Sequence, residues 1–271
     1  MKKIKRFIFS ILVGAGVAYT AICVYFYSIQ NDIIFKPYKL AENAPLDYPF
    51  DFSERWFTMP DGIRIHTIHA KADSSQGKLV FFMHGNLGNV NTDPLKYSVF
   101  LDEGYDVLYP DYRTFGKSEG ELTKEADLIE DMDRLYQQMS SEYAEDSIVV
   151  VGYSLGAAIA AQVASRNNPR NVMLWAPFYS MIDEKDASYG FLPDFLLRYP
   201  LRTDRALPNI DEPVTIIYAE DDEVLPVKRS LKLVDLLKTG DEHLILERQK
   251  HGEMYRNSTL KKELPRILSK Q

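Results

Sequence analysis

Residues 147–158 read Ser147-Ile148-Val149-Val150-Val151-Gly152-Tyr153-Ser154-Leu155-Gly156-Ala157-Ala158, and this stretch decides the fold. An unbroken run of β-branched residues is typical of a parallel strand that is buried on both faces. The small residues that follow favour a helix. The turn between strand and helix matches the pattern G-x-S-x-G, which holds a serine exposed on a sharp, strained bend. We therefore take Ser154 as the candidate nucleophile, in preference to a Gly-Ser turn without chemistry.

The length and charge of the chain restrict the possible classes of function. A chain of 271 residues can form one large α/β domain with a sizeable core. Four of the 32 basic residues and none of the 39 acidic residues lie in the first thirty positions, so the remainder carries a formal charge of −11. An acidic body argues against nucleic-acid binding and against adsorption to anionic lipid. The single cysteine, Cys23, excludes an intramolecular disulfide and a cysteine metal site.

The N-terminal segment is uncharged from Phe7 to Ile29, which is long enough to cross a hydrocarbon layer. The competing interpretation is a cleaved signal peptide, whose apolar core is shorter and ends in small residues. We favour an uncleaved transmembrane anchor over residues 1–30, followed by a catalytic domain over residues 31–271. The basic residues before the span predict a cytoplasmic N-terminus and an extracytoplasmic catalytic domain, periplasmic or extracellular in a bacterium.

Strand and helix patterns alternate along the rest of the chain and predict a doubly wound, mostly parallel sheet. After a proline-containing tether over 31–50, we expect a hairpin from strands 52–59 and 63–70. The other expected strands are 79–83, 106–109, 171–175, 214–218 and 243–247, and the other expected helices are 93–103, 123–141, 227–238 and one from about 253. The proline- and aromatic-rich segment 176–212 is predicted to be a small lid. The acidic residues of helix 123–141 are expected to be solvated: Glu125, Asp127, Glu130 and Asp131.

A serine nucleophile needs a base and an acid that orients the base. In this strand pattern the three residues occur in the order Ser, Asp or Glu, His. His251 follows the last strand in a loop that can reach Ser154, whereas His243 lies inside a strand pattern. The acid is expected after strand 214–218. We select Asp222 because the residues after it turn the chain into the next helix, and Asp221 stays open as the alternative.

These motifs together resemble the α/β-hydrolase superfamily, and most of all its single-span, membrane-anchored serine hydrolases, which include esterases and depalmitoylases. The resemblance runs from the apolar anchor to His251-Gly252 and includes His84-Gly85-Asn86 and Asp111-Tyr112-Arg113. It implies the α/β-hydrolase fold. It also implies an oxyanion hole made by the backbone N–H groups of Asn86 and Leu155. His84 is then a structural brace for its loop.

The sequence thus predicts a serine hydrolase that cleaves carboxylic esters or thioesters through an acyl-serine intermediate, with Ser154, Asp222 and His251 as catalytic residues. No metal or cofactor is expected, and the partners are an acyl substrate and the membrane. Five residues are candidates for an apolar acyl pocket: Phe178, Tyr179, Phe191, Phe195 and Leu196. A serine peptidase of the same fold is the first alternative. A membrane-tethered binding module without catalysis is the second.

Overall fold

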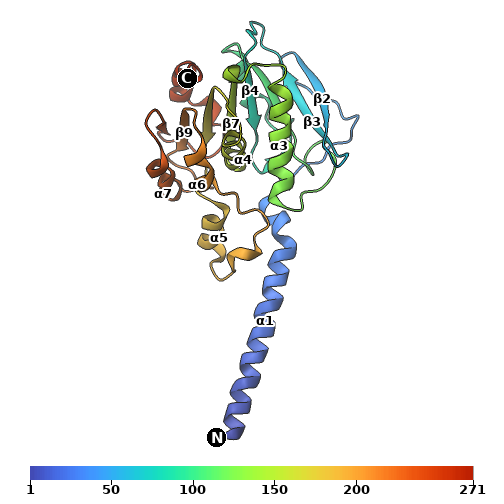
Figure 1. The fold of residues 1–271 in the computed structure, drawn as a ribbon, viewed down its shortest axis with the longest axis vertical. Coiled ribbons are helices and arrows are strands. Elements are labelled where there is room, and N and C mark those ends of the chain that lie inside the picture. The colour runs from blue at the N-terminus through green and yellow to red at the C-terminus, as the bar shows by residue number, and fades with distance from the viewer. Residues whose placement is uncertain (271) are drawn as a thin grey trace.

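The central strand of the molecule is Ile148–Tyr153 (β7), which lies within an eight-stranded sheet (Figure 1). The structure is a computed structural model that describes residues 1–270. The other strands of this sheet are β2 (Phe52–Thr58), β3 (Arg64–Ala70), β4 (Leu79–Met83), β6 (Asp106–Pro110), β8 (Asn171–Trp175), β9 (Val214–Ala219) and β10 (Glu242–Leu246). Their order is β10-β9-β8-β7-β4-β6-β3-β2. Strands from β10 to β6 pair in parallel, and β3 is antiparallel to β6 and to β2. The predicted mostly parallel sheet and the predicted hairpin are confirmed.

Helices cover both faces of the sheet. Successive side chains of β7 point to opposite faces, and every residue of β7 is buried. Val150 packs in the core that includes α3 (Glu125–Met139) and α4 (Leu155–Ala164). Val149 and Val151 pack in a second core with α2 (Ser98–Leu101) and α8 (Ser258–Leu268). The sheet is therefore the middle layer of three, as doubly wound folds require.

Three predicted helices are shorter or less regular in the structure. Segment 93–103 contains a 3-10 helix, Pro94–Lys96, and the single turn α2, after which Gly104 adopts a φ of +77°. Segment 227–238 begins with α7 (Val227–Ser230) and continues as a 3-10 helix. The last helix begins at Ser258 and not near Glu253, because the Asn257 side chain accepts hydrogen bonds from the N–H groups of Thr259 and Leu260 and caps the helix there.

The acidic face of α3 is not simply solvated, which corrects the sequence prediction. Asp131 is buried, and its two carboxylate oxygens accept hydrogen bonds from Arg113 at 2.6 and 2.8 Å. Glu125 accepts a hydrogen bond from the Leu201 N–H at 2.8 Å. Periodicity locates a polar face but does not reveal a basic partner from another segment, and Arg113 lies in the loop after β6.

The N-terminal helix α1 extends from Lys2 to Ile34, four residues beyond the predicted anchor. It is long and apolar enough to cross a membrane, by length and composition. Residues 1–22 are all exposed, and the N-terminal part of α1 projects away from the body of the molecule (Figure 1). The last turns of the helix pack against the body, so the predicted tether begins only after Ile34. There, β1 (Lys36–Pro37) pairs in parallel with β5 (Leu87–Gly88).

The segment predicted as a lid, 176–212, lies beside α1 on the same side of the molecule (Figure 1). It contains α5 (Met181–Tyr189) and α6 (Thr203–Ala206) with short 3-10 turns between and after them. The Ser180 side chain accepts a hydrogen bond from the Asp183 N–H and begins α5. This segment and the end of α1 together enclose the space next to Ser154.

Candidate active site

Ser154 lies on a strained turn between β7 and α4. Its backbone has φ 54° and ψ −118°, a conformation that non-glycine residues rarely adopt. The turn is tight on both sides of the serine. A Cβ on Gly152 would lie 2.2 Å from the Gly156 carbonyl oxygen, and a Cβ on Gly156 would lie 2.1 Å from that of Met83. The two glycines are therefore required by close backbone packing, and the strain presents the Ser154 hydroxyl beyond the end of the sheet.

His251 links Ser154 to Asp222 through both ring nitrogens. Its Nε2 atom lies 3.0 Å from the Ser154 Oγ atom, and its Nδ1 atom lies 2.7 Å from Asp222 Oδ2. Only 12% of the His251 side chain and 3% of the Asp222 side chain are exposed, so water competes little for this contact. This arrangement lets the imidazole accept the hydroxyl proton while a carboxylate holds the opposite nitrogen protonated.

The structure brings Asp222, and not Asp221, to His251. The second carboxylate oxygen of Asp222 accepts hydrogen bonds from the N–H groups of Val224 and Leu225 at 2.9 and 2.6 Å. These bonds fix the carboxylate in one orientation. The side chain of Asp221 is exposed. His243 is exposed on β10 and is not part of this chain of hydrogen bonds.

Asn86 and Leu155 line the cavity beside Ser154, and their backbone N–H groups are the candidates for an oxyanion hole. Leu155 is the first residue of α4, where an N–H group has no partner within the helix. Asn86 follows β4, and neither N–H group donates to an acceptor among residues 1–270. The loop that holds Asn86 is tied to the end of α1. The Asn86 side chain donates to the Ile34 carbonyl at 2.9 Å, and its own carbonyl accepts from the Lys36 N–H at 2.7 Å.

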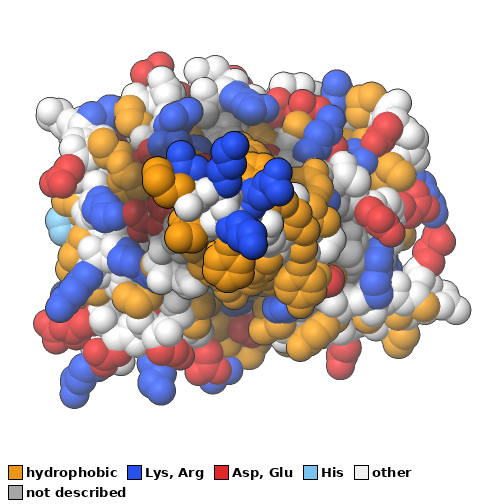
Figure 2. Space-filling view, turned by 90° about the horizontal axis from the view of Figure 1, so that it is seen from below, with side chains coloured by type: hydrophobic (Ala, Val, Ile, Leu, Met, Phe, Trp, Pro, Cys, Tyr) orange, Lys and Arg blue, Asp and Glu red, His pale blue; other side chains and the backbone are white. Residues whose placement is uncertain are grey.

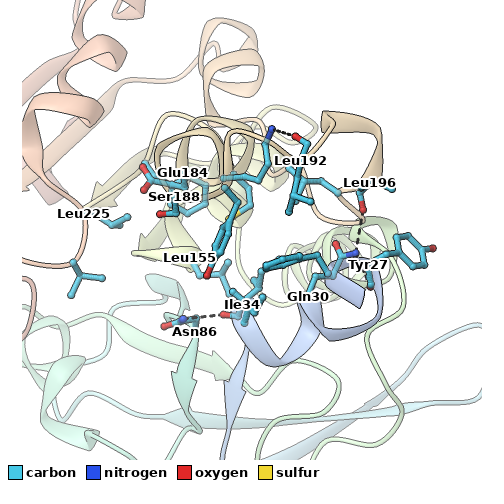
Figure 3. A pocket seen from close by; sticks show the side chains of 18 of the residues that line it. Tyr27, Gln30, Ile34, Asn86, Leu155, Glu184, Ser188, Leu192, Leu196 and Leu225 are labelled. Atoms are coloured by element: carbon cyan, nitrogen blue, oxygen red, sulfur yellow. Dashed lines mark hydrogen bonds between the residues drawn. The ribbon is translucent and has the colours of Figure 1, made fainter. Parts of the chain in front are cut away.

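A largely apolar pocket of about 260 Å³ leads to Ser154 (Figure 3). One wall is the end of α1, and the opposite wall is α5 with the residues that follow it. The lining residues from α1 are Phe26, Tyr27, Gln30, Ile33 and Ile34. Those from the lid segment are Phe178, Met181, Glu184, Lys185, Ser188, Tyr189, Leu192, Pro193, Leu196 and Leu197. Asn86, Leu155, Val224 and Leu225 complete the lining beside Ser154. Such a pocket suits a ligand with one apolar arm.

The chain is similar to several known proteins. The family model described as "Serine aminopeptidase, S33" matches residues 74–198. The lysophosphatidylserine lipase ABHD12 of Danio rerio is 27% identical over 270 residues, which cover 83% of this chain and 70% of that protein. The Mus musculus protein of the same name is 26% identical over 222 residues. These residues cover 72% of this chain and only 56% of that protein. The uncharacterized protein YfhR of Escherichia coli K12 is 23% identical over 94% of this chain and 93% of its own length.

Among solved structures, an esterase of Pyrococcus furiosus superimposes with a TM-score of 0.70 at 19% sequence identity, over 87% of this chain and 97% of its own. The chain has the α/β-hydrolase fold. In this fold the serine, the acid and the histidine follow strands β7, β9 and β10, in the chain order that the sequence predicts.

Three of the five predicted pocket residues lie outside the pocket, which corrects the sequence prediction. Phe178 and Leu196 line the pocket as predicted. Tyr179 lies outside it and packs against the core, with the Lys232 ammonium 5.2 Å from its ring centre. Phe191 and Phe195 do not line the pocket and are 54% and 84% exposed. The sequence identified the aromatic content of the lid, but the direction of each side chain depends on how the lid turns around α1.

Sequence reasoning missed the residues that hold the backbone of His251. The Tyr153 hydroxyl donates to the His251 carbonyl at 2.9 Å, and Glu223 accepts from the His251 N–H at 3.2 Å. Tyr153 is the variable second residue of the G-x-S-x-G motif. Its position next to Ser154 could have indicated a contact with the histidine. The α1 residues of the pocket were also missed, because an anchor and a pocket wall have the same apolar composition.

Three other histidines are buried in the body of the molecule. His84 is buried, its Nδ1 atom lies 2.7 Å from the Gly85 carbonyl oxygen, and its ring packs 4.2 Å from that of Tyr112. Burial lowers the pKa of His84 to about 4, so the ring is neutral at neutral pH. This environment suits the predicted brace of the Asn86 loop. His66 and His69 are buried in β3.

Proposed function

We propose that this protein is a membrane-anchored serine esterase that cleaves carboxylic esters or thioesters through an acyl-serine intermediate. The observation that carries the proposal is the chain of hydrogen bonds Ser154–His251–Asp222 at the end of an apolar pocket. An apolar pocket offers binding energy to an acyl chain, and the hydrogen-bonded serine offers a nucleophile for its carbonyl.

In the proposed reaction the Ser154 Oγ atom attacks the carbonyl carbon while its proton passes to His251 Nε2. The carbonyl oxygen becomes an oxyanion, which the N–H groups of Leu155 and Asn86 stabilise. Each such donor is worth about 3–4 kcal/mol where it has been removed from an enzyme. The C–O or C–S bond then breaks, and His251 returns the proton to the leaving group. Water attacks the acyl-serine in the second half with His251 again as the base, which releases the acid and restores the serine.

The names of the relatives support an acyl ester as the substrate class. They are a lysophosphatidylserine lipase and, among structures, an esterase. We further propose that residues 1–30 anchor the protein in a membrane with the N-terminus in the cytoplasm, and that residues 31–271 form an extracytoplasmic catalytic domain with a lid at 176–212. The support is the uncharged α1 and its basic start at Lys2 to Arg6.

A serine peptidase is the second candidate, favoured by the description of the matching family model. An aminopeptidase needs an acidic group free to bind the α-amino group of its substrate. The acid in the pocket lining is Glu184, whose carboxylate lies 2.7 Å from the Arg229 guanidinium. Burial also raises the pKa of Glu184. The paired carboxylate makes the ester interpretation the stronger one.

Two measurements on the purified full-length protein test the proposal. A fluorophosphonate probe should label the parent and Ser165→Ala but not Ser154→Ala; Ser165 follows the far end of α4. The parent should hydrolyse p-nitrophenyl esters or acyl thioesters faster than aminoacyl p-nitroanilides. Labelling of Ser154→Ala would refute the nucleophile, and faster anilide hydrolysis would establish the peptidase instead. If the probe does not label the parent and the parent hydrolyses neither substrate, the non-catalytic binding module would be the remaining interpretation.

A further inference from the structure

One face of α1 forms a wall of the substrate pocket over about two turns. The lining residues Phe26, Tyr27, Gln30, Ile33 and Ile34 have the spacing of a single helical face. Gln30 and Ile34 are buried against the body, whereas Tyr25 on the other side of the helix is 58% exposed. The helix that is apolar enough to cross a membrane therefore also shapes the space in which the substrate binds.

The lid is attached to this helix by specific hydrogen bonds. The Gln30 side chain donates to the Leu196 carbonyl at 3.1 Å (Figure 3). It also accepts from the Arg198 N–H at 2.8 Å. Farther along the helix, the Tyr19 hydroxyl donates to the Phe191 carbonyl at 2.8 Å. Tyr19 is fifteen residues before Ile34, or about 22 Å along a helix that rises 1.5 Å per residue. The lid thus reaches to a level within the uncharged part of α1.

The tip of the lid exposes large aromatic side chains beside α1. Phe191 and Phe195 are 54% and 84% exposed, and the Phe191 ring also contacts that of Phe26 at 5.8 Å. Viewed along α1 from its N-terminus, the basic side chains at the start of the helix lie at the centre, hydrophobic side chains gather around them, and most acidic side chains lie toward the rim (Figure 2). The acids near the tip, Asp186 and Asp194, are both paired with the ammonium group of Lys185. Exposed aromatic groups next to a spanning helix are suited to the boundary between headgroups and hydrocarbon.

We propose that the pocket opens to the membrane and that its substrate is a membrane-resident acyl ester, whose chain lies along α1 and reaches Ser154 without passing through bulk water. This inference rests on the proposed function. The wall from Phe26 to Ile34 is about 12 Å long. With C–C bonds of about 1.52 Å and tetrahedral angles, an extended chain of about ten carbons spans it. Short, water-soluble esters use only the part of the pocket next to Ser154.

The test uses the full-length protein in phosphatidylcholine vesicles with two substrates, soluble p-nitrophenyl butyrate and membrane-embedded 4-methylumbelliferyl palmitate. The double variant Phe191→Glu/Phe195→Glu places two carboxylates at the lid tip. We expect kcat/KM for the palmitate ester to fall at least about tenfold, because ionised groups at the hydrocarbon boundary are unfavourable, while butyrate hydrolysis stays within about twofold. The control Ile245→Glu changes a 38%-exposed residue of β10 and should alter neither rate.

A second pair of variants tests the wall itself. Phe26→Ala should lower the ratio of palmitate to butyrate turnover, and Tyr25→Ala, on the exposed side of α1, should leave that ratio unchanged. Failure of the parent to hydrolyse either ester would refute the proposed function. Butyrate turnover together with a palmitate rate that is insensitive to the lid and wall variants, or equally sensitive to Ile245→Glu, would overturn this inference alone.

Discussion

Replacing Asp222 with asparagine should nearly abolish turnover by reversing the tautomer of His251. In the parent, Asp222 Oδ1 accepts from the Val224 and Leu225 N–H groups, and Oδ2 accepts from His251 Nδ1. In the variant, the single oxygen of the side-chain amide would keep the two backbone bonds, so its NH₂ group would face His251. The Nδ1 atom must then accept a hydrogen bond, which moves the ring proton to Nε2. An imidazole protonated at Nε2 cannot take the proton of Ser154.

The expected loss is about 10⁴-fold in kcat, or about 5.5 kcal/mol of transition-state stabilisation. The matched control is Asp221→Asn, because Asp221 is exposed and its side chain has no hydrogen-bond partner among residues 1–270; its N–H group donates to the Gln249 carbonyl at 2.9 Å. That variant should stay within about tenfold of the parent. The assay is kcat on one activated ester, with circular dichroism to verify that both variants fold. A folded Asp222→Asn protein within tenfold of the parent, or the reverse ranking of the two variants, would refute this reasoning.

Topology, packing and burial each support one further prediction. A reporter that functions only in the cytoplasm should give no signal when fused to the C-terminus, and a bright fusion would reverse the proposed orientation. Gly156→Ala should prevent folding or probe labelling, because its Cβ would lie 2.1 Å from the Met83 carbonyl oxygen; Gly252→Ala, with no atom within 4 Å of the added carbon, should be labelled like the parent. Burial and the nearby Lys71 and Arg55 lower the pKa of His69 to about 4. Between pH 6.5 and 4, the histidine is therefore protonated in the unfolded chain but not in the folded chain. The free energy of unfolding falls as the pH drops through this range. The loss of melting temperature from pH 7 to pH 5 should therefore be smaller in His69→Gln, and an equal loss would contradict this assignment.

The sequence predicted well those features that depend on local chemistry. The buried strand, the tight glycines and the serine between them occupy consecutive positions, so β7 and the Ser154 turn could be predicted together. The partners of Ser154 were also predictable, because the ends of parallel strands meet at one edge of a sheet and His251 is the one histidine after β10. The acid was less certain, since four consecutive acids, residues 220–223, follow β9.

Features that depend on contacts between distant segments were not predictable from one sequence. Arg113 and Asp131 are eighteen positions apart and pair only after the loop and α3 pack together. The outward direction of Phe195 and the inward direction of Leu196 reverse within one residue, and apolar character alone does not distinguish them. The pocket wall formed by Gln30 and its neighbours could not be predicted without the position of the lid. The lid binds α1 through backbone groups, which leave no pattern in the sequence.

The short pairing of β1 with β5 has a mechanical consequence. No flexible linker separates α1 from the loop that holds Asn86: the Ile34 carbonyl accepts from the Asn86 side chain, and the Lys36 N–H donates to the Asn86 carbonyl. Membranes of different thickness impose different tilts on a spanning helix. A change in the tilt of α1 would thus pull directly on one of the two groups proposed to stabilise the oxyanion. In the proposed membrane-anchored arrangement, we expect the rate of the proposed hydrolysis to depend on the thickness of the surrounding bilayer.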